Sequence, residues 1–236
     1  MTLSIIIPSY NEATTLPQVL DAVRHVELVD HLKKEIIIVD DCSKDHTPSV
    51  VESYQKNHAD LPIRYFRHEQ NQGKGAALRT GIQVAAGDFI LIQDADLEYN
   101  PMEYNLLLEP ILYHHANVVY GSRFMSGKPH RILFFWHSIG NRFLTFCSNM
   151  FTNLNLTDME TCYKLFRADI IKGIEIQENR FGFEPEVTAK ISRLPELVLY
   201  EVGISYHGRT YAEGKKINWQ DGFRALYCIL KYNLFR

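Results

Sequence analysis

Short apolar runs alternate with longer segments of mixed polarity along the first 120 residues. The apolar runs are rich in β-branched residues and predict strands at residues 3–7, 36–39, 63–66, 89–92 and 117–120. The segments between them have helical patterns and predict helices at residues 15–25, 47–57, 75–86 and 101–113. Continuously apolar strands that alternate with helices are typical of a mostly parallel sheet with helices on both faces. The predicted fold class is therefore α/β.

The second half of the chain has a different pattern. Residues 131–156 are rich in aromatics, and a short strand-like segment follows at 162–167. A helix around 184–193, a strand at 197–202, a basic polar loop at 207–216 and a last helix from Trp219 complete the pattern. We find no internal repeat and no low-complexity linker, so we expect residues 1–236 to form a single domain with a specialised C-terminal part.

Composition limits the classes of function. The 236 residues include 46% apolar and 22% charged residues, which is ordinary for a globular protein, and the net charge of −3 gives no general attraction to nucleic acid. Four cysteines lie far apart without a CxxC pair, so neither a zinc site nor a disulfide framework is expected. No apolar run reaches the roughly 18 residues needed to span a bilayer, so we expect a chain that is soluble or attached to a membrane surface.

Acidic residues follow three of the predicted strands. In a parallel sheet, ligands bind beyond the carboxyl ends of the strands, so these residues mark the candidate site. Asp94 and Asp96 are two residues apart in an extended segment and can face one ion. Their hard oxygens favour Mg²⁺ or Mn²⁺. The alternative is that they only solvate a loop or cap the helix that begins near Pro101, but their place after a buried strand favours the metal.

Two further segments can bind parts of a nucleotide. Asp41 follows the second strand and is well placed to accept hydrogen bonds from a base or ribose, whereas Ser43 or Asp45 can instead cap the helix at Thr47. The stretch that contains Lys74, NQGKG, opens the third helix, where glycines and the helix N-terminus favour anions. It lacks the spacing of a Walker loop.

Five segments in this order resemble glycosyltransferase family 2, namely IIIPSYNE, IIIVDDCSKDHT, NQGKGAALRTG, GDFILIQDADLEY and VVYGSRF. The likeness is strongest to the dolichol-phosphate mannosyltransferase and polyprenyl-phosphate glycosyltransferase branch, and it covers residues 3–125. It implies the GT-A fold, a GDP- or UDP-sugar donor and a divalent metal at the Asp-x-Asp motif. Residues 1–125 would bind the donor and residues 126–236 the acceptor. The resemblance assigns the nucleoside pocket to Pro8, Tyr10, Glu12 and Asp41, the metal to Asp94 and Asp96, and a place beside them to Gln93.

Basic residues later in the chain predict a site for an anionic acceptor. The resemblance places Arg123 at phosphates, and a guanidinium suits bidentate contact with phosphate oxygens. Arg131 follows eight residues later, and Arg209 and Lys215 lie in a loop similar to the acceptor loop of the same branch. We expect a polyprenyl phosphate acceptor and an inverting displacement. Asp158 and Glu160 are catalytic candidates, either as a general base or as partners that orient the arginines.

Two aromatic segments predict contact with a membrane. Trp136, Ile139, Phe143, Phe146 and Met150 recur at steps of three and four residues, with basic neighbours, as on a helix at a membrane interface. An ordinary core helix is the alternative, and the segment from Trp219 to Arg236 poses the same choice. We expect a peripheral protein at the cytoplasmic membrane face, and the sequence leaves a membrane-spanning partner subunit open. Rival functions are transfer to a saccharide or protein hydroxyl, nucleotidyl transfer, and an inactive peripheral membrane module of this fold.

Overall fold

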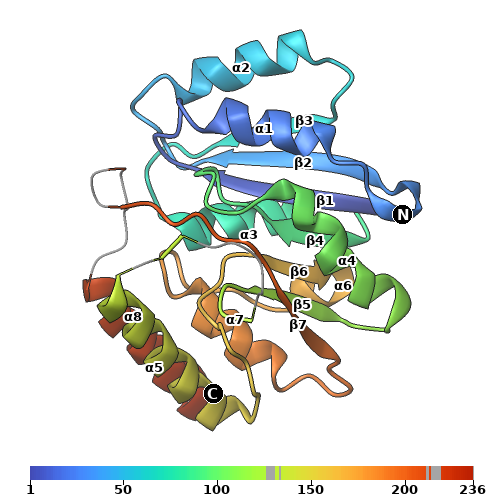
Figure 1. Cartoon of the computed structure of the whole chain (residues 1–236). Coiled ribbons are helices and arrows are strands. Elements are labelled where there is room, and N and C mark those ends of the chain that lie inside the picture. The colour runs from blue at the N-terminus through green and yellow to red at the C-terminus, as the bar shows by residue number, and fades with distance from the viewer. Residues whose placement is uncertain (126–130, 133, 211–212, 214–218, 236) are drawn as a thin grey trace.

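The computed structural model describes residues 1–125, 131–132, 134–210, 213 and 219–235. These residues contain a seven-stranded sheet of order β3-β2-β1-β4-β6-β5-β7 (Figure 1). The strands are β1 (Thr2–Ser9), β2 (Lys33–Asp40), β3 (Ile63–Arg67), β4 (Phe89–Ile92), β5 (Val118–Ser122), β6 (Lys164–Arg167) and β7 (Leu199–Gly203). The longer helices are α1 (Leu16–His25), α2 (Thr47–Asn57), α3 (Lys74–Val84), α4 (Tyr104–Tyr113), α5 (Phe135–Thr152), α7 (Phe183–Ile191) and α8 (Trp219–Leu234).

The sheet is mostly parallel, as the alternation of strands and helices predicts. Strand β1 pairs with β2 and β4 in parallel, and β7 pairs with β5 in parallel. Strand β6 runs antiparallel to both β4 and β5. A local pattern could not reveal this insertion, because an apolar strand reads the same in either direction. It has a consequence for the site, since the residues before β6 arrive at the edge where β4 and β5 end.

Helices cover both faces of the sheet because the central strands are apolar on both sides. Ile5 and Ile36 face a cluster that includes residues of α1, α2 and α4. Ile6 and Ile37, one position further along, face a second cluster with residues of α3, α5, α7 and α8. Each of these four isoleucines is fully buried. The strands therefore read as continuous apolar runs in the sequence rather than as alternating patterns.

Three short elements lie outside the sequence prediction. A 3₁₀ turn, Val29–His31, precedes β2, and another, Pro101–Glu103, begins the region that was predicted as one helix from residue 101. The five-residue helix α6 (Ala168–Lys172) follows β6 directly. Such single turns give too few residues for a periodic pattern, so sequence periodicity misses them.

The aromatic face of α5 lies on the surface. Its exposed fractions are 79% for Trp136, 42% for Ile139, 53% for Phe143, 65% for Phe146 and 61% for Met150. The helical prediction for this segment is confirmed, and the alternative of an ordinary core helix is wrong. Helix α8 packs beside α5 (Figure 1) and also exposes large apolar side chains. Among the described residues, none of the helices is both long and apolar enough to cross a bilayer.

A brace joins α8 to the start of α3. The carboxylate of Glu178 accepts hydrogen bonds from Arg224 Nη2 at 2.6 Å and from the Tyr232 hydroxyl at 2.8 Å, both on α8. The next residue, Asn179, accepts a hydrogen bond through its carbonyl oxygen from the backbone N–H of Ala76 at 3.1 Å. Glu178 is only 4% exposed, so its carboxylate depends on these partners.

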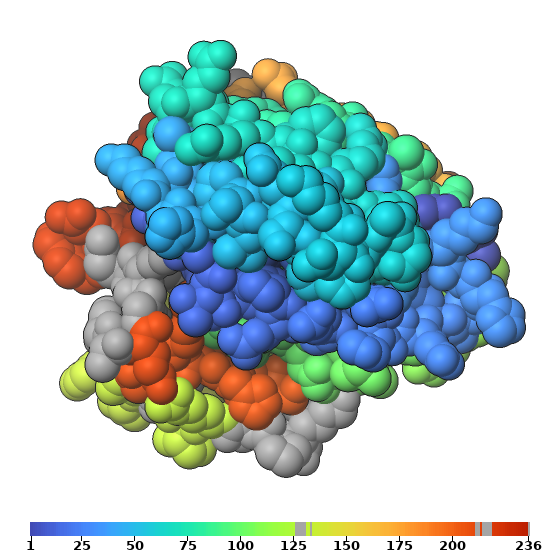
Figure 2. Space-filling model, turned by 90° about the horizontal axis from the view of Figure 1, so that it is seen from above, coloured from blue at the N-terminus to red at the C-terminus, as the bar shows by residue number. Residues whose placement is uncertain are grey.

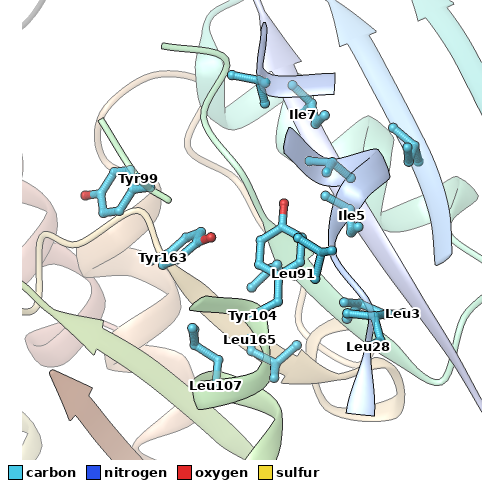
Figure 3. Packing of buried hydrophobic residues seen from close by; sticks show 14 of the residues in the cluster. Leu3, Ile5, Ile7, Leu28, Leu91, Tyr99, Tyr104, Leu107, Tyr163 and Leu165 are labelled. Atoms are coloured by element: carbon cyan, nitrogen blue, oxygen red, sulfur yellow. The ribbon is translucent and has the colours of Figure 1, made fainter. Parts of the chain in front are cut away.

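Stacked tyrosines connect the core to the carboxyl edge of the sheet. Figure 3 shows Tyr104 and Tyr163 among the buried apolar side chains on one face of the sheet, with Tyr99 beyond them. The ring centroids of Tyr99 and Tyr163 are 5.0 Å apart, and those of Tyr99 and Tyr206 are 5.3 Å apart. Rigid aromatic contacts of this kind fix the loops that follow β4 and β7 relative to each other.

We expect Gly81→Ala to destabilise the protein. A Cβ at this position in α3 would clash with Cγ2 of the fully buried Ile6 on β1, and overpacking of a core typically costs about 1–3 kcal/mol. Urea denaturation measures the free energy of unfolding. Gly140→Ala in α5 is the matched control, because a Cβ there meets no atom within 4 Å. Helix propensity then predicts a gain of about 0.5–1 kcal/mol. Equal stability of the two variants would contradict the proposed close packing.

Candidate active site

The ends of β1, β2 and β4 meet at one edge of the sheet. Ser9 lies opposite Asp40 in the register of β1 and β2, and Ile6 lies opposite Ile92 in that of β1 and β4. The backbone N–H of Gln93 donates to the carbonyl of Ile6 at 2.9 Å, so the chain stays extended just past β4. The polar residues after these strands are therefore brought together, as the sequence predicts.

Asp94 forms a half-buried ion pair with Lys74. Lys74 Nζ is 2.7 Å from Asp94 Oδ1, 2.8 Å from Cys162 Sγ and 3.9 Å from Glu184 Oε1. Burial opposes ionisation of Asp94, but the charge of Lys74 outweighs it and the pKa of Asp94 lies below its usual range. Burial likewise opposes the charge of Lys74, yet Asp94 keeps the pKa of Lys74 well above its ordinary value.

Asp96 faces Arg209, which lies in the segment after β7. Arg209 Nη2 is 2.7 Å from Asp96 Oδ2, and its Nη1 is 3.8 Å from Glu12 Oε1. Glu98 holds the same segment, because its Oε1 accepts the backbone N–H of Arg209 at 2.8 Å. Burial, followed by repulsion from Asp94 and Glu98, raises the pKa of Asp96 to about 7, although Arg209 acts in the opposite direction. The site thus carries excess negative charge.

The carboxylates fit a divalent metal by their chemistry. Asp94 and Asp96 supply hard oxygen ligands, and a cation would offset both the burial and the repulsion that raise the pKa of Asp96. Mg²⁺ in nucleotide enzymes is commonly held by one or two carboxylates together with substrate phosphates, so two aspartates meet its need. In the part of the chain that the structure describes, no group of three or more His, Cys, Asp and Glu side chains has a metal-binding arrangement.

The carboxylate of Asp41 shapes the loop before α3. Its Oδ1 accepts the backbone N–H of Gln72 at 2.9 Å, and its Oδ2 accepts that of Gly73 at 2.6 Å. Nδ1 of His68 lies 2.7 Å from Asp41 Oδ1. Gly73 has a φ of 104°, which an L side chain rarely adopts, and this loop places Lys74 at Asp94. In this structure Asp41 binds the protein's own backbone and the ring of His68.

Gln93 belongs to the core rather than to the site surface. Its side chain is fully buried, and its Oε1 accepts hydrogen bonds from the hydroxyls of Tyr104 at 2.9 Å and Tyr163 at 3.1 Å. Its Nε2 donates to the carbonyl of Asp94 at 2.9 Å. These contacts satisfy both ends of the amide, so Gln93 positions the backbone of Asp94.

The remaining nucleoside candidates line the end of β1. Pro8 and Tyr10 are half-buried, and the side chain of Glu12 is buried beside Arg209. Glu12 Oε2 also accepts a hydrogen bond from the hydroxyl of Thr15 at 2.7 Å. Asp45 accepts the backbone N–H of Thr47 at 3.0 Å, but the N-cap of α2 is His46, so the prediction that Ser43 or Asp45 caps this helix is wrong.

Arg123 and Asp158 form a bidentate pair. Arg123 Nε and Nη2 each lie 2.7 Å from an oxygen of Asp158, and the backbone N–H of Arg123 also donates to Asp158 at 3.0 Å. Burial opposes the charge of the guanidinium, but Asp158 outweighs it and raises the pKa of Arg123. The guanidinium lies 5.2 Å from the centre of the Tyr206 ring. Of the two roles left open for Asp158, the geometry favours orientation of Arg123.

Glu160 is a buried carboxyl between other charged groups. Its Oε1 is buried without a hydrogen-bond partner. Burial, followed by the charge of Glu184, raises the pKa of Glu160 to about 8, and Lys164 acts in the opposite direction. Lys164 Nζ donates to the carbonyls of Met159, at 2.8 Å, and of Thr161. At neutral pH Glu160 is therefore mostly protonated and able to donate a hydrogen bond.

The other predicted basic residues are distributed differently. Arg131 Nη1 lies 2.8 Å from Glu213 Oε2 and 3.2 Å from the carbonyl of Gly208, so it borders the segment that carries Arg209. Lys215 lies outside the described residues. Figure 2 shows the orange segment after β7 against the blue N-terminal part of the chain, in agreement with the contact between Arg209 and Glu12.

Sequence reasoning missed several residues of this site. Glu98 holds Arg209, and Tyr206 lies against Arg123 and donates its hydroxyl to Glu98 at 2.6 Å. Glu98 follows Asp96 at the same spacing as Asp96 follows Asp94, a signal that was available in the sequence. Glu184, by contrast, reaches the site from the first turn of α7, and only the tertiary structure places it there.

We expect Glu160→Gln to change the pH dependence of stability. The folded protein holds a proton at Glu160 up to about pH 8, whereas the unfolded chain loses it near pH 4.5. Stability therefore falls as pH rises through this window. Between pH 6 and 8 the wild type should lose on the order of 2 kcal/mol more than Glu160→Gln, at about 1.4 kcal/mol per pH unit. Urea titrations measure this, with the exposed Glu69→Gln as control. Parallel curves for wild type and Glu160→Gln would count against the buried acid.

Comparison with solved structures shows the same fold. The chain superimposes over its whole length on a glucosyl-3-phosphoglycerate synthase from Mycobacterium tuberculosis, crystallised with Mn²⁺, UDP and phosphoglyceric acid. The TM-score is 0.76 at 18% identity, and 79% of that chain is covered. A structure of the same enzyme with Mg²⁺ and UDP matches 98% of the chain and 79% of its own, with a TM-score of 0.72 at 19% identity. The predicted GT-A fold is thus confirmed.

Curated relatives are similar at 27–29% identity. A dolichol-phosphate mannosyltransferase from Pyrococcus furiosus matches 98% of this chain at 27% identity, and the chain spans 64% of its length. A UDP-N-acetylglucosamine–dolichyl-phosphate N-acetylglucosaminyltransferase from Methanococcus voltae matches 96% of the chain and 94% of its own length at 27%. A dolichyl-phosphate β-glucosyltransferase from Dictyostelium discoideum matches 92% of this chain at 29% identity, and the chain covers 68% of its length.

The family model agrees with the motifs and with the fold. It spans 171 of the 236 residues, from residue 4 to residue 174, and so includes the strand ends with Asp94, Asp96 and Arg123 as well as Asp158 and Glu160. The carboxyl-edge site, the GT-A fold and this match together show that the chain is a glycosyltransferase and belongs to glycosyl transferase family 2.

Proposed function

We propose that this chain transfers a hexose from a GDP- or UDP-sugar to a polyprenyl phosphate at a membrane surface, with inversion at the anomeric carbon. One observation carries the proposal. The acidic pair Asp94 and Asp96 lies at the same sheet edge as two half-buried guanidiniums, those of Arg123 and Arg209. An acidic centre suits a metal with a diphosphate, and adjacent guanidiniums suit a second, anionic substrate.

The donor binds where β1, β2 and β4 end. Pro8, Tyr10 and Glu12 flank the nucleoside, and Asp41 keeps the loop before α3 in shape for it. Asp94 and Asp96 hold the divalent metal, Mg²⁺ or Mn²⁺, and Lys74 adds positive charge toward the phosphates. The crystal structures of the mycobacterial enzyme with UDP and either metal support this assignment. When bound, the metal neutralises charge on the departing nucleoside diphosphate.

The residues on the acceptor side need to bind the acceptor phosphate rather than to remove a proton from it. A phosphate acceptor is already ionised at neutral pH, so its oxygen attacks without a general base. Asp158 holds Nε and Nη2 of Arg123 and thereby fixes the plane of the guanidinium. Arg123 and Arg209 bind the acceptor phosphate and hold its oxygen in line with the anomeric carbon, and such positioning accounts for much of the rate. The names of the three dolichyl-phosphate relatives support a lipid phosphate over a sugar hydroxyl.

The exposed aromatic faces of α5 and α8 support a position of the site at a lipid surface. Phe135, Trp136 and Phe146 on α5 are 65–79% exposed, and Trp219 and Phe223 on α8 are 73% and 68% exposed. Basic residues accompany them, as on other interfacial helices. Helix α5 also contacts the segment of the proposed acceptor site, because the guanidinium of Arg142 lies 5.6 Å from the centre of the ring of Phe124, the neighbour of Arg123. Contact with a membrane-spanning partner subunit at the cytoplasmic face is compatible with this surface.

The two parts of the chain thus act on the two substrates. Residues 1–125 hold the donor and residues 126–236 hold the acceptor and the membrane, within one continuous domain. The shared sheet supports a single continuous domain, since β5 belongs to the first part and its neighbours β6 and β7 to the second.

A transfer assay tests the proposal. With Mn²⁺ and GDP-mannose, UDP-glucose or UDP-N-acetylglucosamine, we expect one donor to yield a glycosylated polyprenyl phosphate but no product from the matching polyprenol. Asp96→Asn should lower kcat by at least about 100-fold, because electrostatic stabilisation of the leaving group is lost. The control is Asp169→Asn, an exposed aspartate in the first turn of α6. Transfer to polyprenol or to a saccharide at equal rates would refute the lipid-phosphate acceptor, and release of pyrophosphate would identify a nucleotidyltransferase.

Vesicle binding tests the membrane surface. Trp136→Ser combined with Phe146→Ser should weaken sedimentation with anionic vesicles by about tenfold or more, because each buried aromatic contributes roughly 1.5–3 kcal/mol. Met102→Ser is the control, since Met102 is 59% exposed in the 3₁₀ turn before α4. Unchanged sedimentation of the double variant would show that α5 does not meet the lipid.

A further inference from the structure

Arg209 is the charge partner of Asp96 and lies deep in the acidic site. The exposed fraction of its side chain is 17%, and Nη2, Nη1 and Nε lie 2.7, 3.8 and 3.6 Å from oxygens of Asp96, Glu12 and Glu98. Its Nε forms no hydrogen bond with any described residue. The guanidinium is thus attracted by three carboxylates while its hydrogen-bonding capacity is only partly used.

A guanidinium at this place competes with a metal on Asp96. Arginine stays protonated under all ordinary conditions, so it cannot lose its charge to admit a cation. Two cations on one carboxylate, a few ångströms apart in a partly buried site, repel each other by several kcal/mol. Either the metal stays away from Asp96 or Arg209 leaves it.

Lys74 and Arg209 differ in how they are held. Lys74 belongs to the first turn of α3 and is enclosed by Asp94, Cys162 and Glu184. Arg209 lies in the loop after β7, attached to the site through side-chain contacts and the backbone bond to Glu98. Of the two cations, Arg209 is therefore the one that can move without unwinding a helix.

We propose that Arg209 is the resident counter-ion of Asp96, that a divalent cation displaces it, and that the released guanidinium then binds the acceptor phosphate. The inference rests on the proposed function, since it assigns the metal to Asp96 and a phosphate to the acceptor. Arg209 has two alternative partners, and it turns to the acceptor only after the metal has taken Asp96. The metal and the donor therefore bind before the acceptor. This order prevents the acceptor, when it is present alone, from occupying the metal site.

Binding of Mn²⁺ alone, measured from the electron paramagnetic resonance signal of the free ion, tests the displacement. Arg209→Met should bind Mn²⁺ about tenfold tighter or more than the wild type, which corresponds to about 1.4 kcal/mol or more. Arg209→Lys keeps the charge and should bind much more weakly than Arg209→Met. Arg167→Met is the matched control for net charge. Arg167 also pairs with an aspartate, Asp169, and lies opposite Phe89, at the start of β4 and the far edge of the sheet.

Hydrogen exchange in the wild type gives a second measurement that needs no variant. Addition of Mn²⁺ should raise exchange at the backbone N–H of Arg209, which Glu98 accepts in this structure. Equal Mn²⁺ affinity of Arg209→Met and Arg167→Met, or exchange at Arg209 that Mn²⁺ leaves unchanged, would overturn the displacement. Asp96→Asn distinguishes failure of the displacement from failure of the proposed metal site. If Asp96→Asn still binds Mn²⁺, the metal does not bind at Asp96.

Discussion

Mutual repulsion among carboxylates at the carboxyl edge of the sheet is the constraint on which the rest of the site depends. Asp94, Asp96 and Glu98 follow one strand at intervals of two residues, and burial strengthens their interaction. Such a cluster persists only with positive charge beside it. The protein supplies that charge from two distant segments, through Lys74 at the start of α3 and Arg209 after β7. The ion pairs at the end of β4 thus connect the two halves of the chain.

The sheet and its acidic edge could be predicted because both follow from residues that are adjacent in the sequence. The strands are continuous apolar runs, and the acidic residues come directly after them, so chain order alone places Asp94 and Asp96 at the ligand edge. The helical structure of α5 could also be predicted, since its aromatic residues repeat along one helical face. What the pattern could not settle was whether that face meets the core or the solvent, because both environments accept an apolar stripe.

The roles of single polar residues could not be predicted, because each depends on neighbours from far along the chain. Gln93 stands next to Asp94 in sequence, yet its side chain turns into the core and binds two tyrosines. Asp41 turns toward backbone groups some thirty residues later. The antiparallel strand β6 brings Asp158 to Arg123, and the local sequence around either residue does not predict this ion pair. Sequence motifs therefore identified only part of the site, and the contacts among its residues are seen only in the tertiary structure.

The brace at Glu178 gives the aromatic surface a mechanical connection to the donor loop. Glu178 grips α8 through Arg224 and Tyr232, while the adjacent Asn179 supports the backbone at the start of α3. A force that tilts α8 therefore strains the same short segment that seats Lys74 beside Asp94. The exposed aromatic helix α8 and the first turn of α3 are therefore joined through two adjacent residues, so a displacement of α8 reaches the ion pair between Lys74 and Asp94.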